Sequence, residues 1–448
     1  MSTLVSLRED DSLMRQESTD IPVGTKTITS HQKNTNPGVS IYAMVPLWPN
    51  PTPPLKRPYQ FRVVKEFNDL NRLENDKNDK NVITLSHKYI SPTPTIHTDD
   101  TPEDILTRLI MEHGGPINCK LLYITRHGQS KHNVDALEAG GDQYSAVCAH
   151  FAQDRDPALT NSGEQDAAKA GDLISTSEAA KYAVPSVVYC STLKRTLQTA
   201  VICAARYVPA NMPLTLFPRD GLREFMGPGH LHVSDGRGNK SDILETLSEL
   251  RIFKQLSVEL EEDLPDEDDA FRTAETYINV DIRIEHELAK IFDDTTNRSS
   301  RAVHIVSHNR AIQSILRCLG YSTNQSNYRI FDFDNAATIA LLVSRTPRTE
   351  RQQEDLQASD EALQREESAQ IDESYCADIN SGFEKIQKDC MEGRSDKWQP
   401  WLKKLEEELA NGSSGDVIEW RFELLKKAMS GEFKCGEFAT QKAVGAFQ

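Results

Sequence analysis

The middle of the chain alternates between two hydrophobic patterns. Short runs of β-branched and other apolar residues stop abruptly at polar residues, and amphipathic stretches of helical period follow them. The runs predict strands near residues 119–125, 185–190, 214–218, 301–307 and 328–333 to 337–344, with helices between them. Strands joined by helices favour a mostly parallel central sheet with both faces covered. The predicted fold class is therefore α/β, with three layers in the order α/β/α.

The residues before this block follow other patterns. Residues 1–40 are polar and predict disorder. Twelve of the 21 prolines precede residue 117, so few long elements are expected in the Pro-rich residues 41–116. Within them, residues 59–67 and 82–90 have the composition of strands, and Thr101 before Pro102 indicates the start of a helix. We expect residues 41–116 to pack as an extension on a domain at 117–345.

The C-terminal residues 346–448 predict a helical extension. Residues 349–375 are highly charged and suit a solvated helix or disorder. Residues 396–430 hold three of the four tryptophans and repeat apolar residues at helical spacing, which predicts two helices around a turn at 411–415. We expect this hairpin to dock on the α/β domain, and contact with another protein is the alternative.

Chemically active side chains stand where predicted strands end. They are Arg126, His127 and Asn133 after the first strand, Arg195 after the second, Glu224 in a loop after the third, and His308 after the fourth. The carboxyl ends of parallel strands share one edge of a sheet, which is where open α/β sheets bind ligands. These side chains are therefore expected to form one site.

This order of motifs resembles the histidine phosphatase superfamily, in its phosphoglycerate-mutase-like branch. The resemblance covers about residues 117–345 and implies that His127 is the nucleophile that becomes phosphohistidine. It implies a phosphate pocket and a proton donor as well. The pocket residues are Arg126, Asn133, Arg195 and His308, and the donor is Glu224. One departure is visible, because many members have glycine after the second histidine and this chain has Asn309.

The residue types fit phosphoryl transfer without the resemblance. The reaction needs an in-line nucleophile, positive charge around the phosphoryl oxygens and a proton for the leaving group. His127 must be neutral to attack, and neighbouring cations lower its pKa in that direction. No metal or other cofactor is required. His230 and His232 could suggest a metal site, but spacing nominates no third ligand, so a loop at the mouth of the site is favoured.

Three functions are compatible with these motifs. A metal-independent phosphomonoester hydrolase is favoured. A mutase would need a second phosphate site, and after Glu224 the chain offers it only Arg237, Lys240, Arg251 and Lys254 before the acidic run. A catalytically silent scaffold would not need the complete set of pocket residues. We expect a phosphorylated small molecule as the substrate, whose identity the sequence does not name.

Composition limits the partners and the compartment. The net charge of −17 argues against nucleic acid and anionic membranes as partners, and no apolar run is long enough to span a membrane. Eight scattered cysteines without a Cys-x-x-Cys pair predict a reducing compartment, the cytoplasm or the nucleus. Eight acids within residues 259–269 predict a solvated loop between two helices, the first of them spanning 241–260. Arg223 and His304 are interpreted as structural.

Overall fold

One mixed sheet organises the part of the chain that the structure describes. This computed structural model describes residues 4–6, 57–67, 100–147, 155–209, 213–226, 232–250, 256–266, 268, 275–321, 333–410 and 416–434. Within them the eight strands have the order β1-β6-β5-β4-β7-β3-β8-β2. The strands are β1 (Leu4–Ser6), β2 (Tyr59–Phe67), β3 (Cys119–Arg126), β4 (Val187–Ser191), β5 (Leu214–Arg219), β6 (Leu256–Glu259), β7 (Ala302–Ser307) and β8 (Thr338–Pro347).

The centre of the sheet is parallel and its edges are antiparallel. Strands β6, β5, β4, β7 and β3 run parallel, whereas β8, β2 and β1 are antiparallel to their neighbours. In β3, Leu122 and Ile124 belong to one apolar cluster, and Leu121 and Tyr123 to another on the opposite face. This period of two places apolar side chains on both faces of a central strand.

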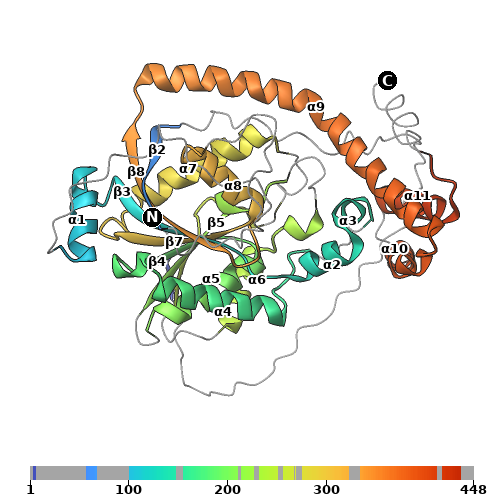
Figure 1. Cartoon of the computed structure of the whole chain (residues 1–448), viewed down its shortest axis with the longest axis horizontal. Helices are drawn as coiled ribbons and strands as arrows, with labels where there is room; N and C mark the ends of the chain where they lie inside the picture. The colour runs from blue at the N-terminus through green and yellow to red at the C-terminus, as the bar shows by residue number, and fades with distance from the viewer. Residues whose placement is uncertain are drawn as a thin grey trace, which may run out of the picture.

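Helices cover both faces of the sheet (Figure 1). Helices α7 and α8 pack on one face, and α1, α4, α5 and α6 lie on the other. The predicted three-layer fold is thus confirmed. The helices are α1 (Pro102–Glu112), α2 (Lys131–Ala139), α3 (Gly141–Val147), α4 (Asn161–Thr176), α5 (Lys194–Tyr207), α6 (Lys240–Glu249), α7 (Tyr277–Asp293), α8 (Asn309–Cys318), α9 (Glu350–Met391), α10 (Gln399–Ala410) and α11 (Asp416–Ser430), with short 3₁₀ turns η4 (Ala179–Lys181), η5 (Asp220–Leu222), η6 (Val233–Asp235) and η8 (Ser395–Lys397).

The N-terminal extension contributes a strand and a helix. Strand β2 pairs with β8 at the edge of the sheet, which confirms the strand predicted at 59–67. Helix α1 begins after Thr101, whose hydroxyl accepts from the Asp104 amide, so that prediction is also confirmed. The strand predicted at 82–90 lies outside the described residues. Disorder is wrong for Leu4–Ser6, which pairs with β6.

The residues around the acidic run differ from the prediction. Helix α6 ends at Glu249, and residues 256–259 form strand β6 beside β5 instead of completing a helix to 260. Glu259 and Asp268 are buried, so this run is not simply a solvated loop. The helix predicted for residues 256–259 is wrong, because Leu256 and Val258 alternate with polar residues, as half-buried strand positions do.

The C-terminal helices form a second apolar cluster. Helix α9 is a single helix of 42 residues that leads from β8 to α10 and α11 (Figure 1). The predicted pair of helices around 411–415 is confirmed. Their apolar faces pack with the end of α9 against α3. We call this set the C-terminal cluster; its buried members are Ala139, Tyr144, Ala146, Val147, Ile379, Phe383, Ile386, Trp398, Leu405, Leu424, Leu425, Ala428 and Phe433. None of the described helices is both long and apolar enough to cross a membrane.

Candidate active site

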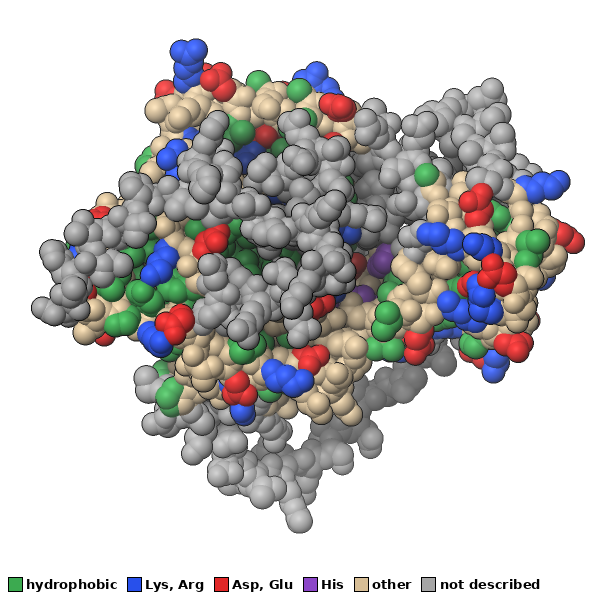
Figure 2. Space-filling model, in the orientation of Figure 1, with side chains coloured by type: hydrophobic (Ala, Val, Ile, Leu, Met, Phe, Trp, Pro, Cys, Tyr) green, Lys and Arg blue, Asp and Glu red, His purple; other side chains and the backbone are tan. Residues whose placement is uncertain are grey.

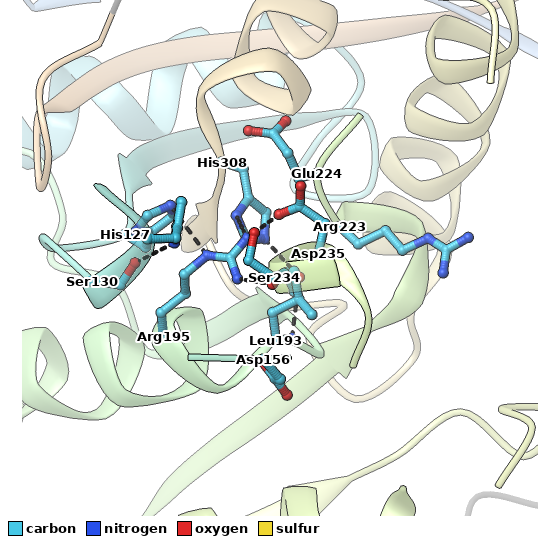
Figure 3. Close-up of polar contacts among 12 residues, drawn as sticks. His127, Ser130, Asp156, Leu193, Arg195, Arg223, Glu224, Ser234, Asp235 and His308 are labelled. Atoms are coloured by element: carbon cyan, nitrogen blue, oxygen red, sulfur yellow. Dashed lines mark hydrogen bonds and ion pairs between the residues drawn. The ribbon is translucent and has the colours of Figure 1, made fainter. Parts of the chain in front are cut away.

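His127 stands directly after β3, at the carboxyl edge of the sheet (Figure 3). Its backbone amide donates to the Ser307 carbonyl at 2.9 Å, which ties the ends of β3 and β7 together. Its ring Nδ1 lies 2.7 Å from the Gly128 carbonyl. A carbonyl only accepts, so Nδ1 carries the hydrogen and Nε2 carries the lone pair. The side chain is buried, and its Nε2 faces the Arg195 guanidinium.

Two glycines let the catalytic loop approach α4 closely. A Cβ on Gly128 would lie 2.3 Å from the Gly163 carbonyl oxygen, and a Cβ on Gly163 would lie 1.9 Å from the Gln129 carbonyl oxygen. Thr160 is the N-cap of this helix, and its hydroxyl accepts from the Gly163 amide at 3.1 Å. The segment before α4 therefore supports the loop that holds His127.

Arg195 lies in the first turn of α5 and is completely buried. Its Nε lies 3.4 Å from His127 Nε2, and its Nη2 lies 3.3 Å from His308 Nδ1. The same guanidinium donates to the Ser234 carbonyl at 2.7 Å and to Asp235 Oδ1 at 2.6 Å. One edge of the planar fork thus faces both histidines, and the remaining donors are held by residues of η6.

His308 is the residue that joins β7 to α8. Its Nε2 lies 2.9 Å from the Ser191 hydroxyl at the end of β4, and its Nδ1 faces Arg195. Arginine only donates, so Nδ1 accepts and the hydrogen is on Nε2. The rings of His127 and His308 meet edge to face, with centroids 5.1 Å apart. Asn309 follows without a positive φ, so the departure from glycine leaves an ordinary helical backbone.

Burial and cations keep these imidazoles neutral. Desolvation lowers the pKa of His127 well below its ordinary value, and the charges of Arg195 and Arg126 lower it further. The same causes lower the pKa of His308. Histidine side chains lie in a recess between the sheet body and the C-terminal helices (Figure 2). A neutral His127 is the form that can attack phosphorus.

Glu224 reaches the site from the loop after η5. Its Oε1 accepts from the amides of Phe225, Arg310 and Ala311 at 2.8, 3.1 and 3.2 Å. Two of these amides begin α8, so the carboxylate is held at a helix N-terminus beside His308. Burial nevertheless raises the pKa of Glu224, and the negative charge of Asp235 adds to this effect.

Two other predicted residues lie next to this centre. Arg126 donates to the Phe333 carbonyl, and its charge acts on both catalytic histidines. Asn133 completes a capping box at the start of α2, because its Oδ1 accepts from the amide of the N-cap residue Ser130 at 3.0 Å. The structure gives Asn133 no hydrogen bond with His127, His308 or Arg195 among those described, so its link to them runs through Asn335, which donates to both Asn133 and the His127 carbonyl.

Sequence reasoning missed Ser191, Ser234 and Asp235. Ser191 comes directly after the β4 run, so its position at a strand end was a usable signal. Ser234 acts through its backbone carbonyl, which no side-chain pattern reveals. Asp235 lies 40 residues from Arg195 in a turn without periodicity. His132 is a further neighbour, with its ring centroid 5.7 Å from that of His127.

The residues interpreted as structural have partners of their own. Arg223 is buried and pairs with Asp268 at 3.1 Å. His304 bonds Thr125 and Tyr207, each at 2.8 Å. His232 packs edge to face on Tyr144, and His230 lies outside the described residues. Among the residues that are described, no group of three His, Cys, Asp or Glu side chains could hold a metal ion.

A family model matches the part of the chain that carries several of these residues. Residues 122–230 match the family model of the histidine phosphatase superfamily, branch 1. The resemblance that the motifs predict is confirmed by this match. The matched segment includes His127, Asn133, Arg195 and Glu224, and it ends before His308. A comparison with curated proteins gives no match.

Solved structures of this superfamily align with about half of the chain. A phosphoglycerate mutase from Bacillus anthracis is 17% identical over 52% of this chain and 92% of its own, with a TM-score of 0.32. A mycobacterial glucosyl-3-phosphoglycerate phosphatase is 16% identical over 51% and 97%, with a TM-score of 0.31. A putative alpha-ribazole-5'-P phosphatase from Escherichia coli is 17% identical over 52% and 96%, with a TM-score of 0.30.

Proposed function

We propose that this protein is a metal-independent phosphomonoester hydrolase that works through a phosphohistidine on His127. The observation that carries the proposal is the orientation of the His127 ring. Its Nδ1 hydrogen is used by the Gly128 carbonyl, which directs the Nε2 lone pair toward Arg195 and His308. A nucleophile so oriented, beside a planar cation, suits in-line attack on a phosphoryl group.

The proposed reaction has two chemical steps. The His127 Nε2 forms a bond to phosphorus while the ester P–O bond breaks, and Glu224 gives its proton to the leaving oxygen. Water then attacks phosphorus and Glu224 takes a proton from that water, while the P–Nε2 bond breaks and releases inorganic phosphate and neutral His127. Arg126 and Arg195 supply the positive charge that the phosphoryl oxygens need in both steps. We assign this chemistry to a unit at residues 117–345.

The burial and hydrogen bonds of the Arg237 side chain favour hydrolysis over mutase activity. A mutase needs cations for a second phosphate, and Arg237 was a candidate. Its side chain is buried and donates to the backbone carbonyls of Pro265, Asp266 and Gly238. Arg251 and Lys254 lie outside the described residues. The Arg237 guanidinium thus binds the loop at 265–266, which leaves fewer cations for a second phosphate site.

A trapping experiment tests the proposal. Rapid quenching of the protein with a radiolabelled phosphomonoester, in EDTA, should give a protein-bound phosphate that is acid-labile and base-stable, as a phosphohistidine is. His127→Ala should give none. Inorganic phosphate should appear in step with substrate loss. A phosphorylated isomer that accumulates faster than phosphate, and depends on an added bisphosphate, would replace the hydrolase with a mutase.

A further inference from the structure

Asp235 is the strongest unexplained feature of the site. It forms a buried ion pair with Arg195 at 2.6 Å, with side-chain exposures of 1% for Arg195 and 8% for Asp235. A carboxylate beside the phosphate-binding arginine has two contrasting interpretations. It could occupy the place of a phosphoryl oxygen and inhibit the protein, or it could hold the arginine in the orientation that binds phosphate.

The donors of Arg195 distinguish these interpretations. Nε and Nη2 form the edge of the guanidinium that suits bidentate recognition, and this edge faces His127 and His308. The Ser234 carbonyl takes Nη1, and Asp235 takes Nη2, which has a second hydrogen for the His308 side. Residues 234 and 235 therefore hold the fork and leave its histidine-facing edge for a ligand.

The turn that carries Asp235 is anchored, which a displaceable plug would not be. The Arg237 amide donates to Asp268 Oδ2 at 2.8 Å, and its buried guanidinium bonds three carbonyls. The Gly238 amide donates to Asp156 Oδ2 at 3.1 Å. On the other side of the turn, the ring of His232 packs on Tyr144 with centroids 5.2 Å apart. A carboxylate in such a turn has few alternative positions.

We propose that Asp235, together with the Ser234 carbonyl, is a positioning residue that orients the Arg195 fork toward the space between His127 and His308. This inference rests on the proposed function, because it assigns Arg195 to the phosphoryl group. A buried arginine without this partner would lose its fixed plane and keep an uncompensated charge. Displacing a phosphate clamp by about 1 Å can lower turnover on the order of 10²-fold.

Two substitutions test the proposal. Asp235→Ala removes the acceptor, and Asp235→Asn keeps an oxygen for Arg195 Nη2. We expect Asp235→Ala to lower kcat/KM for p-nitrophenyl phosphate by about 10- to 100-fold, with a higher KM and a lower kcat. Asp235→Asn should remain within about fivefold of the wild-type value. The Nε–H resonance of Arg195 should be sharp in the wild type and in Asp235→Asn, and broadened in Asp235→Ala.

Binding of inorganic phosphate separates this proposal from the proposed function. Isothermal titration requires no turnover, so a weaker phosphate affinity in Asp235→Ala would support positioning even if the protein hydrolysed no ester. Asp281→Ala is the matched control, because it breaks an Arg–Asp pair with Arg317 between α7 and α8. It should lower Tm without changing phosphate affinity. Higher activity and phosphate affinity in Asp235→Ala would overturn the proposal and identify Asp235 as an inhibitory plug. An Asp235→Ala protein that matches the wild type at low temperature and differs only in Tm would also overturn it.

Discussion

The sheet body and the C-terminal cluster each bury a set of large apolar side chains, but they relate to the candidate site in different ways. One buried hydrogen-bonded group forms around Arg195 at the ends of β3, β4 and β7. It contains His127, Ser191 and His308. The C-terminal cluster contributes no side chain to that group among the described contacts. Its one described ring contact toward the site is Tyr144 on His232. The fold thus separates the residues of the candidate site from a large helical addition.

The two regions also differ in how many buried polar groups must find hydrogen-bond partners. In the sheet body, polar groups are buried at the ends of parallel strands, and each needs a partner because an unsatisfied buried group costs about 1–3 kcal/mol. The C-terminal cluster consists mainly of apolar side chains such as Phe383 and Leu425, beside one buried arginine, Arg421, that donates to the Ala146 carbonyl. Substitutions in the first region should therefore change turnover, and substitutions in the second should change mainly stability.

The largest effect on turnover is expected for His127→Ala. Removal of the nucleophile should lower kcat by about 10³-fold or more, whereas the protein should remain folded, with a cooperative thermal transition. Steady-state assays with p-nitrophenyl phosphate and thermal denaturation measure the two quantities. Wild-type activity in folded His127→Ala would end the phosphohistidine proposal.

A second buried histidine provides the matched control. His304 lies on β7 and is held by Thr125 and Tyr207. His304→Ala should leave two hydroxyls without this partner and lower the free energy of unfolding by about 1–3 kcal/mol, with kcat largely retained. A loss of kcat as large as that of His127→Ala would show that burial alone, and not the position of the ring, decides activity.

Arg195→Ala should follow, with a loss of about 10²- to 10³-fold in kcat/KM. The cause is removal of a preorganised donor pair from the phosphoryl oxygens. Arg206 is a matched control on the same helix, since it pairs with Asp172 at the surface. Arg206→Ala should stay within about twofold of the wild-type kcat/KM. A loss under threefold in Arg195→Ala would place that residue outside the phosphate pocket.

Glu224→Gln should have an effect that depends on the leaving group. An alkyl phosphate needs a proton on its leaving oxygen and should lose about 10²- to 10³-fold in kcat, whereas p-nitrophenyl phosphate should lose much less. Parallel assays of both substrates measure this ratio. Equal losses on the two substrates would indicate a binding role for Glu224, and no loss on either would mean that it takes no part.

The same carboxyl predicts a pH dependence. Burial and Asp235 raise the pKa of Glu224, while the charges of Arg310 and Arg195 and the Phe225 amide oppose them. The acid form dominates below this raised pKa, so kcat/KM for an alkyl phosphate should fall as pH rises through it. Asp235→Asn removes one raising charge and should move this fall to lower pH. A pH profile of Asp235→Asn that coincides with that of the wild type would contradict the assigned coupling.

The sequence predicted the parts of the site that follow strands and failed where the chain only turns. His127, Arg195 and His308 come after or shortly beyond apolar runs, so the topology of a parallel sheet brings them together. Asp235 and the Ser234 carbonyl lie in a 3₁₀ turn, and only the folded path places them on Arg195. Strand β6 was missed for a different reason, since the apolar spacing of residues 241–260 favoured a helix through its four residues.

The smallest effect on turnover is expected for Leu425→Ala in the C-terminal cluster. Leu425 is fully buried on α11, and its truncation should destabilise that region by about 2–5 kcal/mol. Three of the four tryptophans, Trp398, Trp401 and Trp420, lie in these helices, so fluorescence reports on their unfolding. Leu216→Ala on β5 is the matched truncation in the sheet.

Heating then compares the two regions directly. In Leu425→Ala the fluorescence transition should move to lower temperature. The value of kcat/KM at 25 °C should stay within about threefold of the wild type, and activity should be lost at nearly the wild-type temperature. The reason is that the candidate site takes its side chains from the sheet body. In Leu216→Ala the temperature of activity loss should itself fall, because the strands that carry the pocket unfold. A tenfold loss of kcat/KM in Leu425→Ala, with weaker phosphate binding, would contradict the independence of the candidate site from the C-terminal cluster. It would mean that the C-terminal helices hold the Asp235 turn in place through α3 and the Tyr144–His232 contact.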